Sequence, residues 1–170
     1  MCHGSLFAKE LNYIHVDQKA IIKSVDIKAP KEKVWDVLLN DKFTRIWYAE
    51  FSEGSHAETD WTPGSKAIFT DNTGNGLVGK VVVNKPNEIL SVQYQGMMRN
   101  GIEDFESDES KSVKGGHETY LLSQKDGNTK LSIECDMSEE LFESMSKLWD
   151  KALQKIKQLS EMDGQDRYNE

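Results

Sequence analysis

The strongest constraint on this chain is a long apolar stripe near its C-terminus. Between Ser138 and Gly164, apolar side chains recur at helical spacing. The stripe consists of Leu141, Met145, Leu148, Ala152, Ile156 and Leu159, and it is widened by Phe142, Trp149 and Leu153. At about 1.5 Å per residue such a helix is roughly 40 Å long, enough to cross a small sheet. A helix with one wide apolar face has to bury that face against another layer.

The other layer is predicted to be an antiparallel sheet. Turn-forming strings separate six β-favouring runs, at Thr62-Pro63-Gly64, residues 72–76, Lys85-Pro86-Asn87 and residues 125–128. The runs are Ser52–Ala57, Lys66–Asp71, Leu77–Asn84, Ile89–Gln95, Glu118–Ser123 and Thr129–Asp136. Several runs alternate between apolar and polar residues, which gives each strand one buried face. We therefore expect a meander whose apolar face is covered by the C-terminal helix.

A further strand and two short helices are predicted before the meander. Residues 20–27 alternate in the manner of a half-buried strand, although Lys23 interrupts the apolar face. Pro30 suits the first position of a helix that runs to about Leu39, and a second short helix is expected over residues 41–48. Residues 1–19 have no clean period and are expected to form an N-terminal extension, with an added strand as one option.

These elements predict one α+β domain over residues 20–162 and a polar C-terminal tail over residues 163–170. A chain of 170 residues can bury one good core but is too short for two ordinary domains with a linker. Residues 96–116 are predicted to be a long, mobile connection with an acidic cluster. This cluster is expected to be solvated, or alternatively to dock on a basic partner or gate a pocket.

The charge of the chain limits its partners. Its net charge is −8, with 29 acidic against 21 basic residues, which argues against binding to nucleic acid or to anionic lipid surfaces. The sequence has no apolar run long enough for membrane insertion, and its first residues do not resemble a secretion signal. Two cysteines, Cys2 and Cys135, are too few for a disulfide framework. A cytoplasmic location is therefore expected.

One glycine-rich string resembles a nucleotide-binding motif. Residues 74–81 read G-x-G-x-x-G-x-V, but a β-rich run follows the glycines where a dinucleotide site needs a helix. We expect an ordinary hairpin turn here, in which Asn75-Gly76 supplies the positive φ angles.

The sequence shows no catalytic or metal-binding signature. The histidines, at positions 3, 15, 56 and 117, lack the spacing of zinc ligands, so no metal or cofactor is expected. Cys135 lies on the apolar side of its strand and is interpreted as an inert core thiol. Asp26, Glu118 and Glu134 are interpreted as solvated residues on strand faces. A buried carboxylate that acts as an acid or base stays an open alternative.

The space between helix and sheet has two possible contents. Packed interiors are the rule in proteins, so periodicity alone favours a solid core. A sheet that curls around the helix can instead leave a pocket, walled by large side chains such as Phe69, Tyr94 and Trp149. Trp35 and Trp149 are expected in the core, whereas Trp47 could line a cavity mouth.

Four local strings, taken in order, resemble one superfamily. They are Ile27-Lys28-Ala29-Pro30 with Lys33-Val34-Trp35, then Gly79-Lys80-Val81 with residues 85–90, then Thr129-Lys130-Leu131, and finally residues 148–153. Together they cover residues 20–161 and are similar to the START-like (SRPBCC) superfamily, most of all to the branch related to the activator of the heat-shock protein 90 ATPase. The resemblance implies a helix-grip fold, in which a curved antiparallel sheet wraps around a long C-terminal helix. It also implies a hydrophobic cavity, which this superfamily uses for lipids, sterols or polyketides.

The leading hypothesis is a non-catalytic domain that binds an apolar small molecule or lipid between the sheet and the C-terminal helix. The side chains expected to contact this ligand are Trp47, Phe69, Val81, Leu90, Val92, Tyr94, Tyr120, Leu131, Ile133, Met145 and Trp149. The alternative is a co-chaperone-like module that binds a chaperone, although residues 1–19 are too short for the separate N-terminal domain of the eukaryotic activator. The third is a cyclase-type enzyme, for which the sequence shows no recognisable polar constellation.

Overall fold

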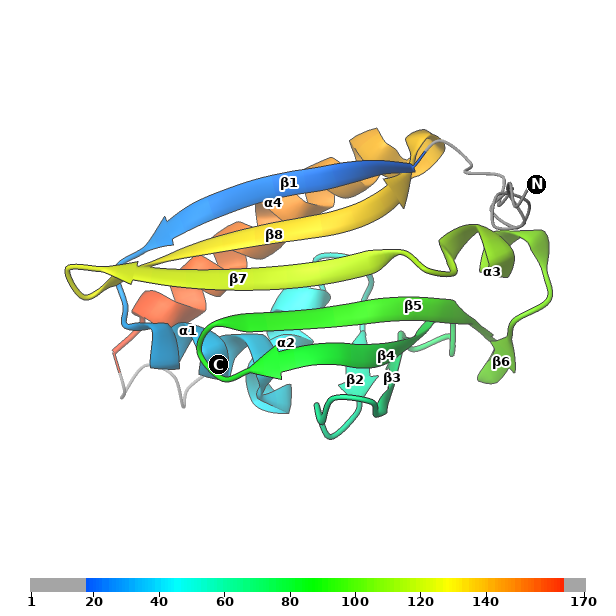
Figure 1. The fold of residues 1–170 in the computed structure, drawn as a ribbon, viewed down its shortest axis with the longest axis horizontal. Helices are drawn as coiled ribbons and strands as arrows, with labels where there is room; N and C mark the ends of the chain where they lie inside the picture. The colour runs from blue at the N-terminus through cyan, green and yellow to red at the C-terminus, as the bar shows by residue number, and fades with distance from the viewer. Residues whose placement is uncertain (1–17, 164–170) are drawn as a thin grey trace, which may run out of the picture.

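The computed structural model describes residues 18–163 and contains an eight-stranded antiparallel sheet with helices against one face (Figure 1). The elements in chain order are β1 (Gln18–Ile27), α1 (Lys31–Leu39), α2 (Asp41–Tyr48), β2 (His56–Glu58), β3 (Lys66–Thr70), β4 (Gly76–Lys85), β5 (Ile89–Arg99), β6 (Ile102–Asp104), α3 (Asp108–Val113), β7 (His117–Lys125), β8 (Asn128–Ser138) and α4 (Glu139–Glu161). The strand order is β1-β8-β7-β5-β4-β3-β2, and β6 pairs with β5. The predicted α+β helix-grip fold is confirmed. The expectations for residues 1–17 and for the tail from residue 164 lie outside the described residues.

Helix α4 crosses the sheet and is unevenly buried along its length. Its C-terminal half supplies the core residues Trp149, Ala152, Leu153, Ile156 and Leu159. In its N-terminal half, by contrast, Leu141 is 50% exposed and Met145 is only half-buried. The stripe therefore packs tightly at one end of the sheet and overhangs it at the other. None of the helices between residues 18 and 163 is long and apolar enough to cross a membrane.

A salt bridge explains the lysine that interrupts the apolar face of β1. Lys23 Nζ lies 2.5 Å from the Asp150 carboxylate of α4, which keeps the charge of Lys23 paired at the edge of the core. Asp150 itself is exposed, so this pair also holds α4 over β1 at the border with solvent.

Helices α1 and α2 form a corner beside α4. Asn40 ends α1 and caps α2, where its side chain accepts a hydrogen bond from Lys42 N at 3.2 Å. The indole Nε1 of Trp47 donates to the Val37 carbonyl at 3.0 Å, inside the core. This buried bond fixes α2 on α1 and directs the ring of Trp47 toward α4.

The structure corrects the prediction for residues 96–116. Strand β5 continues through Gly96 to Arg99, turns into β6 and leads into α3, so this segment is not a structureless connection. Its acidic side chains are partly neutralised, because Arg99 pairs with both Asp104 and Glu109. Ser107 donates to Asp104 and also caps α3. Asp104 accepts hydrogen bonds from Ser107 Oγ, Ser107 N and Glu106 N, and these bonds together with Arg99 lower its pKa to about 2.

The glycine-rich string forms the predicted β3–β4 hairpin, with Thr70 opposite Gly76. The expected backbone angles were wrong, however: the positive φ, 78°, belongs to Gly74. Asp71 organises the turn by accepting hydrogen bonds from Thr73 N and Oγ1. Gly76 is required for another reason, because a Cβ there would lie 1.8 Å from the Phe69 carbonyl oxygen.

Among the long strands β1, β4, β5, β7 and β8, the shortest pairing is the one between β5 and β7. Strand β1 pairs with β8 over its whole length, whereas β5 pairs with β7 only through Ile89–Gln93. Beyond that point, Tyr94 exchanges backbone hydrogen bonds with Gly115 and Gly116, the residues that lead from α3 into β7. Figure 1 shows α3 beside the start of β7, at the end of the sheet that α1 and α2 leave uncovered.

Candidate ligand-binding site

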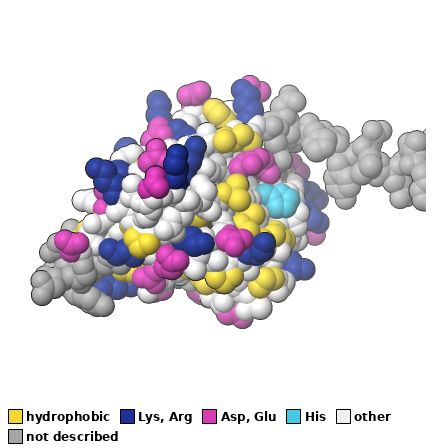
Figure 2. Space-filling model, turned by 60° about the vertical axis from the view of Figure 1, so that its left-hand side comes forward, with side chains coloured by type: hydrophobic (Ala, Val, Ile, Leu, Met, Phe, Trp, Pro, Cys, Tyr) yellow, Lys and Arg dark blue, Asp and Glu magenta, His cyan; other side chains and the backbone are white. Residues whose placement is uncertain are grey.

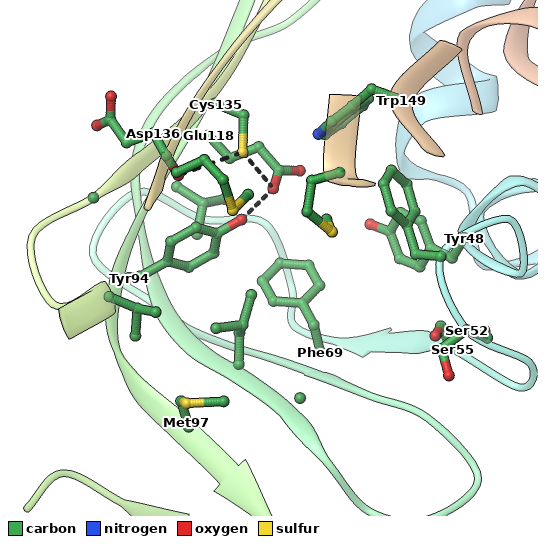
Figure 3. A pocket seen from close by; sticks show the side chains of 18 of the residues that line it. Tyr48, Ser52, Ser55, Phe69, Tyr94, Met97, Glu118, Cys135, Asp136 and Trp149 are labelled. Carbon is green, nitrogen blue, oxygen red and sulfur yellow. Dashed lines mark hydrogen bonds between the residues drawn. The ribbon is translucent and has the colours of Figure 1, made fainter. Parts of the chain in front are cut away.

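A hollow of about 480 Å³ lies between the sheet, α2 and the overhanging half of α4. Most of the residues predicted to contact a ligand line it, namely Trp47, Phe69, Leu90, Val92, Tyr94, Tyr120, Met145 and Trp149. Val81, Leu131 and Ile133 do not line it; they are fully buried in the packed core beside it. Figure 3 shows the hollow, with Tyr94, Glu118 and Cys135 on one side and Tyr48 and Trp149 on the other.

One wall is built from aromatic rings of α2, α4 and the sheet. The Trp149 ring centroid lies 4.9 Å from that of Phe51 and 6.1 Å from that of Tyr120. Trp47 stacks edge-on against Tyr48 at 4.3 Å. Such rings provide a large, rigid apolar surface. This wall therefore keeps its shape when the hollow is not filled by side chains of the protein.

The register of the sheet places one carboxylate in an otherwise apolar row. Val92 of β5 is opposite Glu118 of β7, which is opposite Cys135 of β8, which is opposite Ile21 of β1. Paired residues point to the same face of a sheet. The three apolar members of this row are nearly inaccessible, whereas Glu118 is half-buried and lines the hollow. Glu118 is therefore the charged side chain in an otherwise apolar row of the sheet.

Glu118 has several hydrogen-bond donors around it. The hydroxyls of Tyr94 and Tyr120 donate to its two carboxylate oxygens, and the Cys135 thiol lies 3.9 Å from Oε2. Burial raises the pKa of Glu118, while the bonds from Tyr120, Tyr94 and Cys135 oppose this shift. Burial and the Glu118 charge also raise the pKa values of Tyr94, Tyr120 and Cys135. The tyrosines and the thiol therefore stay protonated at neutral pH, in agreement with an inert Cys135.

The prediction that Glu118 is a solvated strand-face residue was wrong. A signal for its true position was present, since Glu118, Tyr120 and Leu122 share one face by the period of two residues in a strand. Tyr120 and Leu122 are both buried, so Glu118 follows them inward. Its polarity favoured the opposite interpretation only because the hollow that receives it is invisible in the sequence.

The mouth of the hollow carries polar side chains and one strained residue. Ser52 donates to Asp71 at 2.9 Å, and the bonds from Thr73 and Ser52 lower the pKa of Asp71 to about 2. Trp61 lines the hollow with φ at 60°, a conformation that is costly for a bulky side chain. Its carbonyl accepts from the Asn84 amide at 2.9 Å, which helps to hold this backbone. Sequence periodicity gave no indication of Trp61 as a wall residue.

The sequence matches the family described as Activator of Hsp90 ATPase homolog 1-like protein over residues 28–161. The match extends from the end of β1 to the end of α4, which is most of the chain. The chain belongs to this family. The predicted resemblance to the activator branch is therefore confirmed. None of the curated proteins matches the chain in sequence.

Several solved structures share the fold of this family member. Protein MLL2253 from Mesorhizobium loti is 16% identical with a TM-score of 0.65, and the match covers 83% of this chain and 96% of that protein. The Aha1 dimer from Colwellia psychrerythraea is 19% identical with a TM-score of 0.65, covering 85% of this chain and 97% of that one. CalU16 from Micromonospora echinospora is 16% identical with a TM-score of 0.60, and the match covers 84% of this chain and 76% of that one. At these identities the likeness establishes the fold alone.

Proposed function

We propose that this chain binds an apolar small molecule or lipid in the hollow and does not convert it. The observation that carries the proposal is the hollow itself, about 480 Å³ in size and walled mainly by apolar and aromatic side chains. Pockets for small ligands are typically concave, apolar and equipped with a few polar groups. Here the polar groups include Glu118 at the wall and Ser52 and Asp71 at the mouth. A cytoplasmic location stays a prediction.

The overhang of α4 supports access to this site. Leu141 and Met145 belong to the apolar stripe and line the hollow, yet Leu141 is 50% exposed and Met145 is only partly buried against the core. Exposed apolar side chains at the rim of a pocket are a common feature of binding sites. A ligand that contacts Leu141 and Met145 would complete the burial of the stripe.

Two measurements test the binding proposal. Native mass spectrometry of protein purified from its host should detect a co-purifying apolar molecule, and the neutral dye Nile red should gain fluorescence on titration with ligand-free protein. Replacement of Met97, a half-buried wall residue, by Trp should fill the hollow and weaken the dye signal. Ile22→Trp is the matched control, because Ile22 is 71% exposed outside the hollow. Equal dye binding by both variants, or no binding by the unaltered protein, would contradict the proposal. Recovery of a chemically altered ligand would contradict non-catalytic binding and favour the cyclase-type alternative.

Family membership favours a second candidate, a co-chaperone-like module that binds a chaperone. The acidic segment 103–109 is a weak support for it, because Arg99 and Lys66 already pair with some of its carboxylates. A pull-down with a heat-shock protein 90 and an assay of its ATPase test this candidate. Association that weakens with salt, together with a changed ATPase rate, is the expected result. Absence of both effects would reject it.

A further inference from the structure

We propose that the ligand carries a hydrogen-bond-donating group, a hydroxyl or an amine, which binds Glu118, and that the hollow rejects anionic ligands such as carboxylates. This inference rests on the proposed function, because it names the chemical class of molecule that the same hollow takes. It is carried by the unused capacity of Glu118 and by the charges of the wall.

The Glu118 carboxylate has capacity left for a ligand. A carboxylate offers about four lone-pair sites. Tyr94 and Tyr120 occupy one site each, and Cys135 is a long, weak third partner. Glu118 is half-buried because it borders the hollow, and in Figure 3 its carboxylate lies in the space between Tyr94 and Trp149. An apolar ligand without a donor would cover this carboxylate and leave it short of partners, which is costly.

The charges around the hollow are of one sign. Its lining includes the carboxylates of Asp71 and Glu118, and among the described residues no lysine or arginine lines it. The remaining titratable side chain with a possible positive charge is His56 at the mouth, which lies 3.5 Å from Glu58. A ligand carboxylate placed near Glu118 would meet a like charge in an apolar surrounding, where repulsion is strong. The same field attracts an ammonium group and tolerates a neutral hydroxyl.

A purely structural role for Glu118 makes a different prediction. In that case its bond to Tyr94 ties β5 to β7, its bond to Tyr120 lies within β7, and a substitution changes stability without changing the order of ligand affinities. The test therefore has to compare ligands that differ only in their polar group. Naphthalene, naphthol, naphthylmethylamine and naphthoate, substituted at one common ring position, form such a series and suit an aromatic wall.

Isothermal titration of the unaltered protein with the four probes gives the primary result. Naphthol, naphthylmethylamine or both should bind about tenfold or more tightly than naphthalene, as expected for a hydrogen bond to a charged acceptor. Naphthoate should bind at least about a hundredfold more weakly than the tighter of these two. Preference for naphthol over the amine identifies a neutral hydroxyl ligand, and the reverse order identifies a cationic one.

Glu118→Gln should reduce the differences in affinity among the four probes, so that naphthoate binds more tightly and naphthylmethylamine more weakly than they bind to the unaltered protein. Glu134→Gln is the matched control, since Glu134 lies in the neighbouring strand β8 with its side chain exposed. Binding of naphthalene together with equally tight binding of naphthoate would overturn the inference and leave the proposed function intact. Binding of no probe would contradict both. The comparison with unaltered protein needs no variant, so it decides the question even if Glu118→Gln does not fold.

Discussion

Replacement of Trp149 by Ala tests the packing of α4 against the hollow. Trp149 is 1% exposed and contacts the rings of Trp47, Phe51 and Tyr120. Removal of a buried tryptophan typically costs about 3–5 kcal/mol. Two features of the site predict a loss of stability at the lower end of this range. The ring borders a hollow, and its buried Nε1–H has at most the weak acceptor Cys135 Sγ as a partner among the described residues, so its loss removes a poorly satisfied donor.

We therefore expect the free energy of unfolding to fall by about 3 kcal/mol, and the melting temperature by roughly 6–12 °C. Urea unfolding followed by far-UV circular dichroism measures the first quantity, and calorimetry measures the second. Leu141→Ala is the matched control from the same stripe. Because Leu141 is 50% exposed, its replacement should change the free energy by less than about 0.5 kcal/mol. A loss below about 1 kcal/mol for Trp149→Ala, or equal losses for the two variants, would refute the packing described here.

Three further predictions concern charge and backbone. Because the pKa of Glu118 is raised by folding, the folded protein holds this proton more tightly than the unfolded chain does. In urea unfolding, the unaltered protein should therefore lose stability relative to Glu118→Gln as pH rises above about 4.3. The pKa of Asp71 is lowered to about 2, so its charged form stabilises the folded protein above about pH 3.9, and this stabilisation is lost as pH falls through about 2. Asp71→Asn should therefore destabilise the protein at neutral pH and have a smaller effect in acid. Gly76→Ala should cost about 1–3 kcal/mol or more in thermal unfolding, because its Cβ would collide with the Phe69 carbonyl.

Each of these has a clear opposing outcome. A pH-independent difference for Glu118→Gln would mean that its carboxyl is not desolvated. A constant effect of Asp71→Asn across the acid range would mean that its charge is not the source of the stabilisation. An unchanged melting temperature for Gly76→Ala would mean that the β3–β4 hairpin relaxes without cost.

The fold could be predicted because two periodicities dominate the sequence. The two-residue alternation through Leu90, Val92 and Tyr94 and through Leu131, Ile133 and Cys135 corresponds to buried faces in β5 and β8. The helical spacing of α4 is equally plain. Both patterns depend on local geometry, which a sequence records directly.

The site was only partly predictable, because periodicity reports which face points inward and not what the interior contains. Leu141 and Ile156 belong to one stripe, yet one is half exposed and the other fully buried. Their difference depends on where the hollow separates α4 from the sheet. Glu118 shows the same limit, since its inward direction follows from strand parity while its contact with Tyr94 depends on the pairing of β5 with β7. The acidic residues after Gly96 suggested a loop because charge outweighed the short strand and helix signals there.

The short pairing between β5 and β7 gives the domain a mechanical weak line. Among the long strands, tension across the sheet acts first on the ladder with the fewest paired residues, which is β5–β7. Separation there gives two plates, β1-β8-β7 with α4 and β5-β4-β3-β2. Phe69 and Val92 contact the hollow from one plate, and Tyr120 and Cys135 contact it from the other. A molecule held in the hollow would touch both plates at once. Its presence would stiffen the domain across this line and raise the force needed to separate its halves.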